Sequence, residues 1–112
     1  MIRCLMLCVS VALAAALLCP ASAHADCLLP APPSHIPDGD SANQQEMLAA
    51  MRTFKQYNDD VDEYTKCLEF EQRQNHISNA VQVLRRNIAI NQLETIVTRF
   101  NEQVRRFKAR HT

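Results

Sequence analysis

The chain has 112 residues, of which 47% are hydrophobic and 21% charged, and its 12 basic and 12 acidic side chains give a formal net charge of zero. Proteins that bind nucleic acid or lie on anionic membranes usually carry a clustered cationic excess. The balanced charge argues against nucleic acid as a partner and gives the chain as a whole no cationic excess for membrane binding, although membrane contact through a local patch is left open.

Residues 1–25 have the composition of a secretory signal peptide. Arg3 supplies a positive charge, residues 4–18 form an apolar stretch, and small residues follow it. The stretch is shorter than the roughly 20 residues of a membrane-spanning helix. We therefore predict a periplasmic or secreted protein that is cleaved after Ala25 and is not integral to a membrane. Cleavage after Ala23 and lipidation of Cys19 are the alternatives.

Cleavage would remove three of the five cysteines and leave Cys27 and Cys67 as a pair. An even pair in an exported protein is typical of a disulfide, so we predict that these two residues are joined. Two free thiols, or a bridge between two chains, are the alternatives. A bonded Cys67 is no nucleophile, and the Cys-x-x-Cys motif of thiol oxidoreductases does not occur.

Residues 26–40 are predicted to form an extended arm, because prolines fix φ and push the preceding residues toward extended conformations. The prolines of the arm are Pro30, Pro32, Pro33 and Pro37. The arm ends at the turn signal Asp38-Gly39-Asp40. Ser41 and Gln44 then match a capping box, which predicts that a helix begins at Ser41.

Residues 41–112 contain no glycine or proline and are predicted to form a helical hairpin domain. Apolar residues spaced three and four apart form a first seam: Met47, Ala50, Phe54, Tyr57, Val61, Tyr64 and Leu68. A second seam, out of phase with the first, consists of Val83, Ile90, Leu93, Val97, Phe100, Val104 and Phe107. The polar segment 74–79 between the seams is typical of a bend between two helices of about 33 residues each. One continuous rod is the alternative.

The arm is long enough to run back along the first helix. An extended chain from Cys27 to Ser41 spans about 43 Å, and a helix from Ser41 to Cys67 spans about 39 Å. We therefore predict that the arm is a strap, antiparallel to the first helix and held at its far end by the disulfide. The apolar side chains expected to cover the seam are Leu28, Leu29 and Ile36.

Short motifs are spread along most of the mature chain: Cys27-Leu-Leu-Pro30, Ile36-Pro-Asp-Gly39, Glu46-Met47, Tyr57, Tyr64-Thr-Lys-Cys67-Leu68, Phe100-Asn-Glu-Gln103 and Phe107-Lys-Ala-Arg110. With these motifs the chain resembles a group of small exported helical proteins of Gram-negative bacteria that have no assigned activity. The group has a longer connector between its helices, so this chain departs from it at the bend. The resemblance implies a helical periplasmic protein and supplies no catalytic residues.

No set of side chains matches a catalytic, metal or cofactor pattern. The acidic run Asp59-Asp60-Val61-Asp62-Glu63 lacks calcium-loop spacing and is typical of a solvated helix face. The histidines at 35, 76 and 111 share no ligand spacing. Tyr57 and Tyr64 are predicted to be core aromatics with hydroxyls at the rim, and a stacking platform for a ligand is the alternative.

The end of the second helix is cationic and is the candidate contact with an anionic surface or an acidic partner. Its residues are Arg99, Arg105, Arg106, Lys108 and Arg110. Complementarity with the negative end of the helix dipole is the alternative explanation of this charge.

The sequence thus predicts an all-α fold: a two-helix antiparallel hairpin whose extended proline-rich arm is strapped on by a disulfide. It predicts no enzyme. The expected function is binding, in an envelope-associated interaction or a stress response, with a chaperone-like holdase for unfolded periplasmic proteins as the alternative. Because two helices cover each other's apolar seams poorly, we also expect either an unknown protein partner or self-association into a four-helix homodimer.

Overall fold

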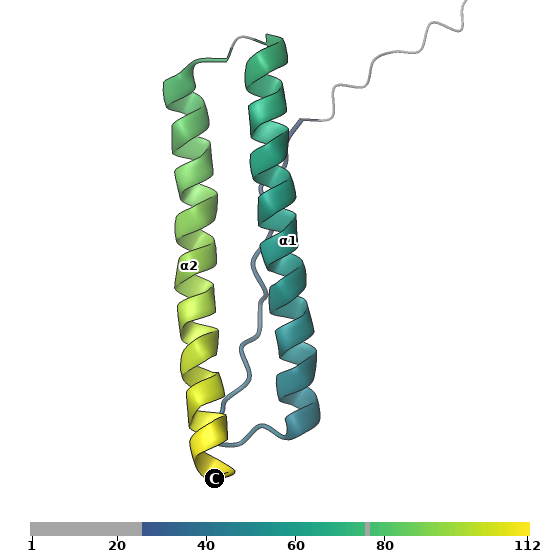
Figure 1. The fold of residues 1–112 in the computed structure, drawn as a ribbon, viewed down its shortest axis with the longest axis vertical. Helices are drawn as coiled ribbons and strands as arrows, with labels where there is room; N and C mark the ends of the chain where they lie inside the picture. The colour runs from purple at the N-terminus through teal and green to yellow at the C-terminus, as the bar shows by residue number, and fades with distance from the viewer. Residues whose placement is uncertain (1–25, 76) are drawn as a thin grey trace, which may run out of the picture.

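A computed structural model describes residues 26–75 and 77–112, which form two long antiparallel helices and an arm (Figure 1). Helix α1 comprises Gln44–Asn75 and helix α2 comprises Asn79–Arg110, each of 32 residues. The predicted hairpin is confirmed and the continuous rod is wrong. The predicted signal peptide, its cleavage sites and His76 lie outside the described residues.

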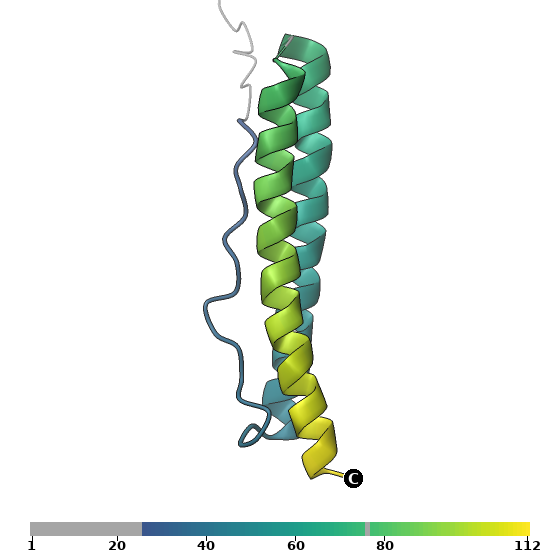
Figure 2. The same ribbon diagram turned by 90° about the vertical axis from the view of Figure 1, so that its left-hand side faces the viewer.

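The arm lies on one face of the helix pair and runs back along α1 (Figures 1 and 2). A disulfide joins Cys27 to Cys67, with Cα atoms 5.7 Å apart, so the strap is confirmed. Ile36 packs against the core as expected. Leu28 and Leu29, however, are 82% and 44% exposed. Their predicted covering role is wrong, because Cys27 itself points inward to reach Cys67 and occupies the place next to the seam.

Helix α1 begins later than predicted. The capping box is formed by Asn43 and Glu46: the Glu46 N–H donates to Asn43 Oδ1 (2.9 Å), and the Asn43 N–H donates to Glu46 Oε2 (2.7 Å). Ser41 is not the N-cap. Its hydroxyl donates to the Asp38 carboxylate, and its N–H to the Asp38 carbonyl, so the turn that starts at Asp38 extends past Ser41 and delays the helix.

The buried line of α1 is the predicted first seam, with Ala50 half-buried and the other six residues buried. The Tyr57 hydroxyl, which was predicted to lie at the rim of the core, is buried instead. Tyr57 is only 3% exposed, and its hydroxyl has no hydrogen-bond partner among the described residues. Burial of this hydroxyl raises the pKa of Tyr57.

The buried line of α2 differs from the predicted second seam. Its fully buried residues are Gln82, Ala89 and Phe100, and only Phe100 was expected. Val83 is 47% exposed, and the other predicted members are half-buried. Ile90, Leu93, Val104 and Phe107 nevertheless pack against the core clusters. Of the predicted seam, Val83 and Val97 are the members that belong to neither cluster of the described residues.

The core consists of two clusters along the hairpin. One surrounds the disulfide and includes Tyr57, Val61, Tyr64, Leu68 and Ala89. The other lies toward the open end, where Phe54 of α1 stacks on Phe100 of α2 with ring centroids 4.3 Å apart. Within the described residues, no helix is long and apolar enough to cross a membrane.

Candidate functional site: the arm-free face

The two faces of the helix pair differ because the arm covers only one of them. On α2, a line of residues seven apart lies beside the arm. Arg85 donates to the Cys27 carbonyl (3.1 Å), Gln92 and Arg99 line a hollow with Pro32, and Arg106 pairs with Asp40. On α1, Cys67 is bonded to the arm, and Thr53 and Asp60 line a hollow with arm residues 31 and 33.

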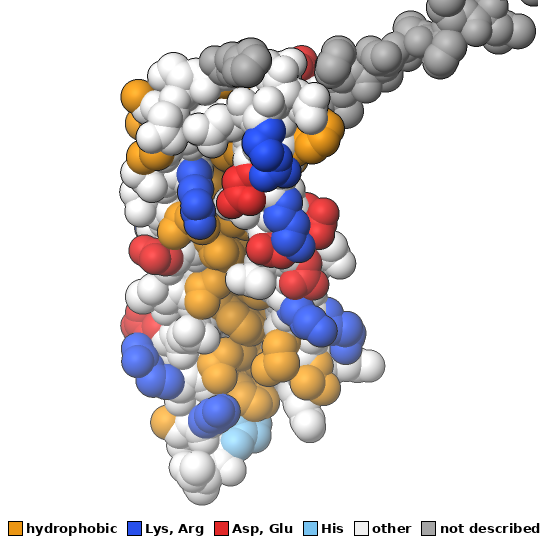
Figure 3. All heavy atoms as spheres, turned by 45° about the horizontal axis from the view of Figure 1, so that its top comes forward, with side chains coloured by type: hydrophobic (Ala, Val, Ile, Leu, Met, Phe, Trp, Pro, Cys, Tyr) orange, Lys and Arg blue, Asp and Glu red, His pale blue; other side chains and the backbone are white. Residues whose placement is uncertain are grey.

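The opposite face, which we call the arm-free face, carries an apolar stripe. Val83, Ile90, Val97 and Val104 are also seven apart, and each lies two residues before a member of the α2 line beside the arm. Two residues correspond to about 200° around a helix, so the stripe lies across the helix from the arm. Figure 3 shows hydrophobic side chains forming a strip along this face, bordered by charged side chains on both helices.

Helix α1 supplies a more polar line to the same face. The residues two positions before Thr53, Asp60 and Cys67 are Met51, Asn58 and Thr65, and Gln72 continues the series. Met51 is half exposed and Thr65 and Gln72 are half-buried. The arm-free face therefore has an aliphatic half on α2 and a mainly polar half on α1.

The disulfide end of the strap is closed by a part-buried ion pair. Glu71 Oε2 accepts from Arg85 Nη1 (2.7 Å), and Glu71 Oε1 accepts from the Cys27 N–H (3.0 Å). These contacts hold the pKa of Glu71 below its ordinary 4.5, the Cys27 N–H being the largest cause, although burial opposes the shift. The sulfurs of Cys27 and Cys67 and a Glu71 oxygen lie within 4.8 Å of one another. In the disulfide the sulfurs are not thiolates, so this group is a closure of the strap and not a ligand set.

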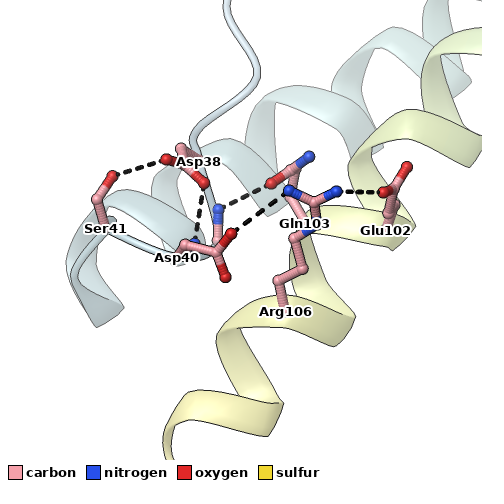
Figure 4. Close-up of polar contacts among 7 residues, drawn as sticks. Asp38, Asp40, Ser41, Glu102, Gln103 and Arg106 are labelled. Carbon is pink, nitrogen blue, oxygen red and sulfur yellow. Dashed lines mark hydrogen bonds and ion pairs between the residues drawn. The ribbon is translucent and has the colours of Figure 1, made fainter.

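The other end of the strap is a turn docked on α2 (Figure 4). The Gly39 N–H donates to Gln103 Oε1 (2.9 Å), and Arg106 bridges Asp40 (3.4 Å) and Glu102 (2.7 Å). The Asp40 N–H and the Ser41 hydroxyl lower the pKa of Asp38 within the turn.

The predicted cationic surface is divided by these contacts. Arg106 holds the turn, and Arg110 donates to the Ala42 carbonyl and lies over the Phe107 ring at 5.7 Å. Arg99 lines an open cavity of about 390 Å³ beside the arm. Arg105 and Lys108 are exposed. Arg106 and Arg110 therefore hold the segment 40–42 against α2, and contact of the cationic end with an anionic surface stays a prediction.

A cavity of about 750 Å³ opens between residues 33–42 and the start of α1. It is lined by His35, Ser41, Asp38 and Glu46 among others. The Ser41 hydroxyl donates to Asp38 (3.2 Å) and not to His35, so a serine activated by histidine is not formed here.

Comparison with known proteins found no match: no family model, no curated protein and no solved structure matches this chain. The resemblance to a group of small exported proteins stays a prediction.

The sequence contained the signal for the arm-free face, since Val83, Ile90, Val97 and Val104 form an exact heptad. Sequence reasoning assigned these residues to a buried seam because it had no way to know on which side of α2 the arm would lie. The closure by Glu71 and Arg85 was missed altogether, because neither residue belongs to a motif.

Proposed function

We propose that this protein is exported to the periplasm, is released by cleavage after Ala25, and acts there by binding through its arm-free face. The observation that carries the proposal is the one-sided cover of the hairpin. The arm and its disulfide seal one face, whereas the aliphatic stripe of α2 stays partly open to solvent on the other. An open apolar strip bordered by charges is typical of an interaction surface.

An envelope-associated role agrees with the disulfide, because structural disulfides typically form and persist in oxidising compartments. Intact mass of the protein purified from the periplasm without reductant tests this part. The expected species starts at Asp26 and is lighter than the reduced chain by two hydrogens. A lipid adduct, an uncleaved chain or free thiols would contradict it.

Site-specific photo-cross-linking in the cell tests the binding surface. A photoreactive amino acid at Val97, in the middle of the stripe, is expected to give a discrete adduct. The matched control places it at Leu84, which is also an exposed aliphatic residue of α2 (61%) but lies off the stripe. Adducts from Leu84 and none from Val97 would overturn the proposed surface.

The alternative function is a holdase, which the same stripe favours because exposed aliphatic surface can capture unfolded chains. The test is suppression of aggregation of a reduced model substrate. Suppression that disappears in Val97→Asp and persists in Leu84→Asp would support a holdase. No suppression at several-fold excess would remove this alternative and leave binding of a folded partner.

A further inference from the structure

We propose that the occupant of the arm-free face is a second copy of this chain, lying antiparallel to the first and forming a four-helix bundle. This inference rests on the proposed function, since it names the partner of the same face. The dimer is symmetric, and its two-fold axis lies in the interface and crosses the helices at right angles.

The size of the face suits a stable dimer. A helix of 32 residues is about 48 Å long, and two packed helices are about 20 Å wide, which gives about 960 Å² for each copy. Specific dimers bury about 800 Å² for each partner. The four helices would then enclose a central core, as in antiparallel bundles.

The antiparallel arrangement lays the aliphatic stripe on its own symmetry mate. With the axis in this direction, α2 faces α2 of the second copy, and the stripe residues meet in the pairs Val83 with Val104 and Ile90 with Val97. The midpoint of the stripe lies between residues 93 and 94, and the midpoint of the polar line Met51 to Gln72 lies between residues 61 and 62. Both midpoints are about 16 residues from the bend at residue 77, so they lie at the same height along the hairpin. A single two-fold axis can therefore pass through the midpoints of both lines.

The parallel arrangement is less favourable because it places α2 of each copy on α1 of the other. The aliphatic stripe would then lie on Asn58, Thr65 and Gln72, which would lose water without gaining a matched apolar surface.

The charge along the molecule favours the same orientation. The half near the disulfide, comprising Asp26 and residues 60–94, has four cationic and seven anionic side chains. The half near the turn, comprising residues 38–59 and 95–112, has seven cationic and five anionic side chains. An antiparallel dimer brings the acidic half of each copy onto the basic half of the other, whereas a parallel dimer opposes like charges.

Sedimentation of the mature, disulfide-bonded chain over a range of concentrations tests the assembly. We expect a dimer, and we expect Val97→Asp to raise its dissociation constant by at least about tenfold, because each dimer buries two of the introduced carboxylates. The control Leu84→Asp should leave the constant unchanged. Circular dichroism of both variants checks that the hairpin still folds.

Spin labels attached at Lys108 through a cysteine substitution distinguish the two orientations. In the antiparallel dimer the two labelled positions lie about 14 residues on either side of the axis, or about 44 Å apart. In the parallel dimer they lie at the same height, separated by about the 20 Å width of the bundle. A short distance would overturn the arrangement.

A strict monomer at every soluble concentration would overturn the inference. If Val97 nevertheless gives an adduct of another mass in the cell, the proposed function stands with a different partner. If Val97 gives no adduct and the chain is monomeric, both proposals fall.

Discussion

Glu71 lies on α1 and contacts both the arm and α2. Its carboxylate accepts a hydrogen bond from the arm at Cys27 and pairs with Arg85 of α2, which in turn donates to the Cys27 carbonyl. The Glu71 side chain is 12% exposed, so these contacts are shielded from solvent more than the surface ion pairs of the hairpin. Hydrogen bonds to a charged group of this kind contribute about 1.5–3 kcal/mol.

The lowered pKa of Glu71 predicts how stability depends on pH. Because the folded pKa lies below the unfolded value, the contribution of Glu71 is present above the unfolded pKa, near 4.5, and is lost as the pH falls through the folded pKa. We expect Glu71→Gln to lower stability at pH 7 and to flatten the loss of stability below about pH 4.5. Chemical unfolding at a series of pH values measures this.

The control for this prediction is Glu63→Gln, at an exposed glutamate on the same helix (77%). It should keep the acid slope of the unaltered protein. An equal acid slope in all three proteins would contradict the role of Glu71.

Gly39 is required by the close approach of the turn to α2. A Cβ at this position would overlap the Gln103 carbonyl oxygen and lie 2.9 Å from the Phe107 nitrogen, both of them backbone atoms. We expect Gly39→Ala to push the turn off α2, to weaken the bond to Gln103, and to lower stability by about 1–3 kcal/mol. Thermal unfolding measures the loss. Asp40→Ala, which removes only an exposed ion pair, should cost about 0–1 kcal/mol, and an equal loss in both variants would refute the steric argument.

At the scale of elements, α1 begins at a different N-cap from the one that the sequence predicted. Asn43 Oδ1 accepts the capping hydrogen bond from the Glu46 N–H, whereas the Ser41 hydroxyl donates to Asp38 in the preceding turn. We expect Asn43→Ala to lower the free energy of unfolding by about 1 kcal/mol, the usual cost of a lost N-cap. Ser41→Ala should cost less in the same denaturant titration. The reverse order would mean that the helix begins two residues earlier.

The arm depends on its disulfide because it forms no helix and has no sheet partner among the described residues. The bond closes a loop with a sequence separation of 40. In the chain-entropy model such a loop contributes about 4 kcal/mol. We expect the double variant Cys27→Ser, Cys67→Ser to lose most of that amount in urea unfolding. A loss well below the entropic value would show that the packing of Ile36 and the docked turn hold the arm without the bond.

At the scale of the whole molecule, the opposite charge of the two halves predicts that association depends on salt. Exposed charges are screened over about 10 Å at 0.1 M ionic strength. We therefore expect the dissociation constant of the dimer to rise as sodium chloride is added, while the apolar stripe keeps the dimer from dissociating completely. Sedimentation at low and high salt measures the change. A constant that falls with added salt would show that charge complementarity does not set the orientation.

The sequence by itself determined the helices, the bend and the first seam. These features depend on neighbours along the chain: an apolar period of three and four residues, prolines that keep the arm extended, and a polar segment between two seams out of phase. The pairing of Cys27 with Cys67 followed from the cysteine count, since cleavage of the predicted signal peptide leaves only these two. The matching lengths of the arm and the first helix then predicted the strap.

Only the tertiary structure decided which side of α2 is buried, where the turn ends, and which arm residues point inward. Each of these depends on a contact between segments far apart in the sequence. Val83 is exposed and Gln82 buried because α2 faces two neighbours, α1 and an arm that precedes it by about 50 residues. Leu28 is exposed because Cys27 takes the inner position. The arm-free face exists for the same reason: one strap can cover only one side of two helices.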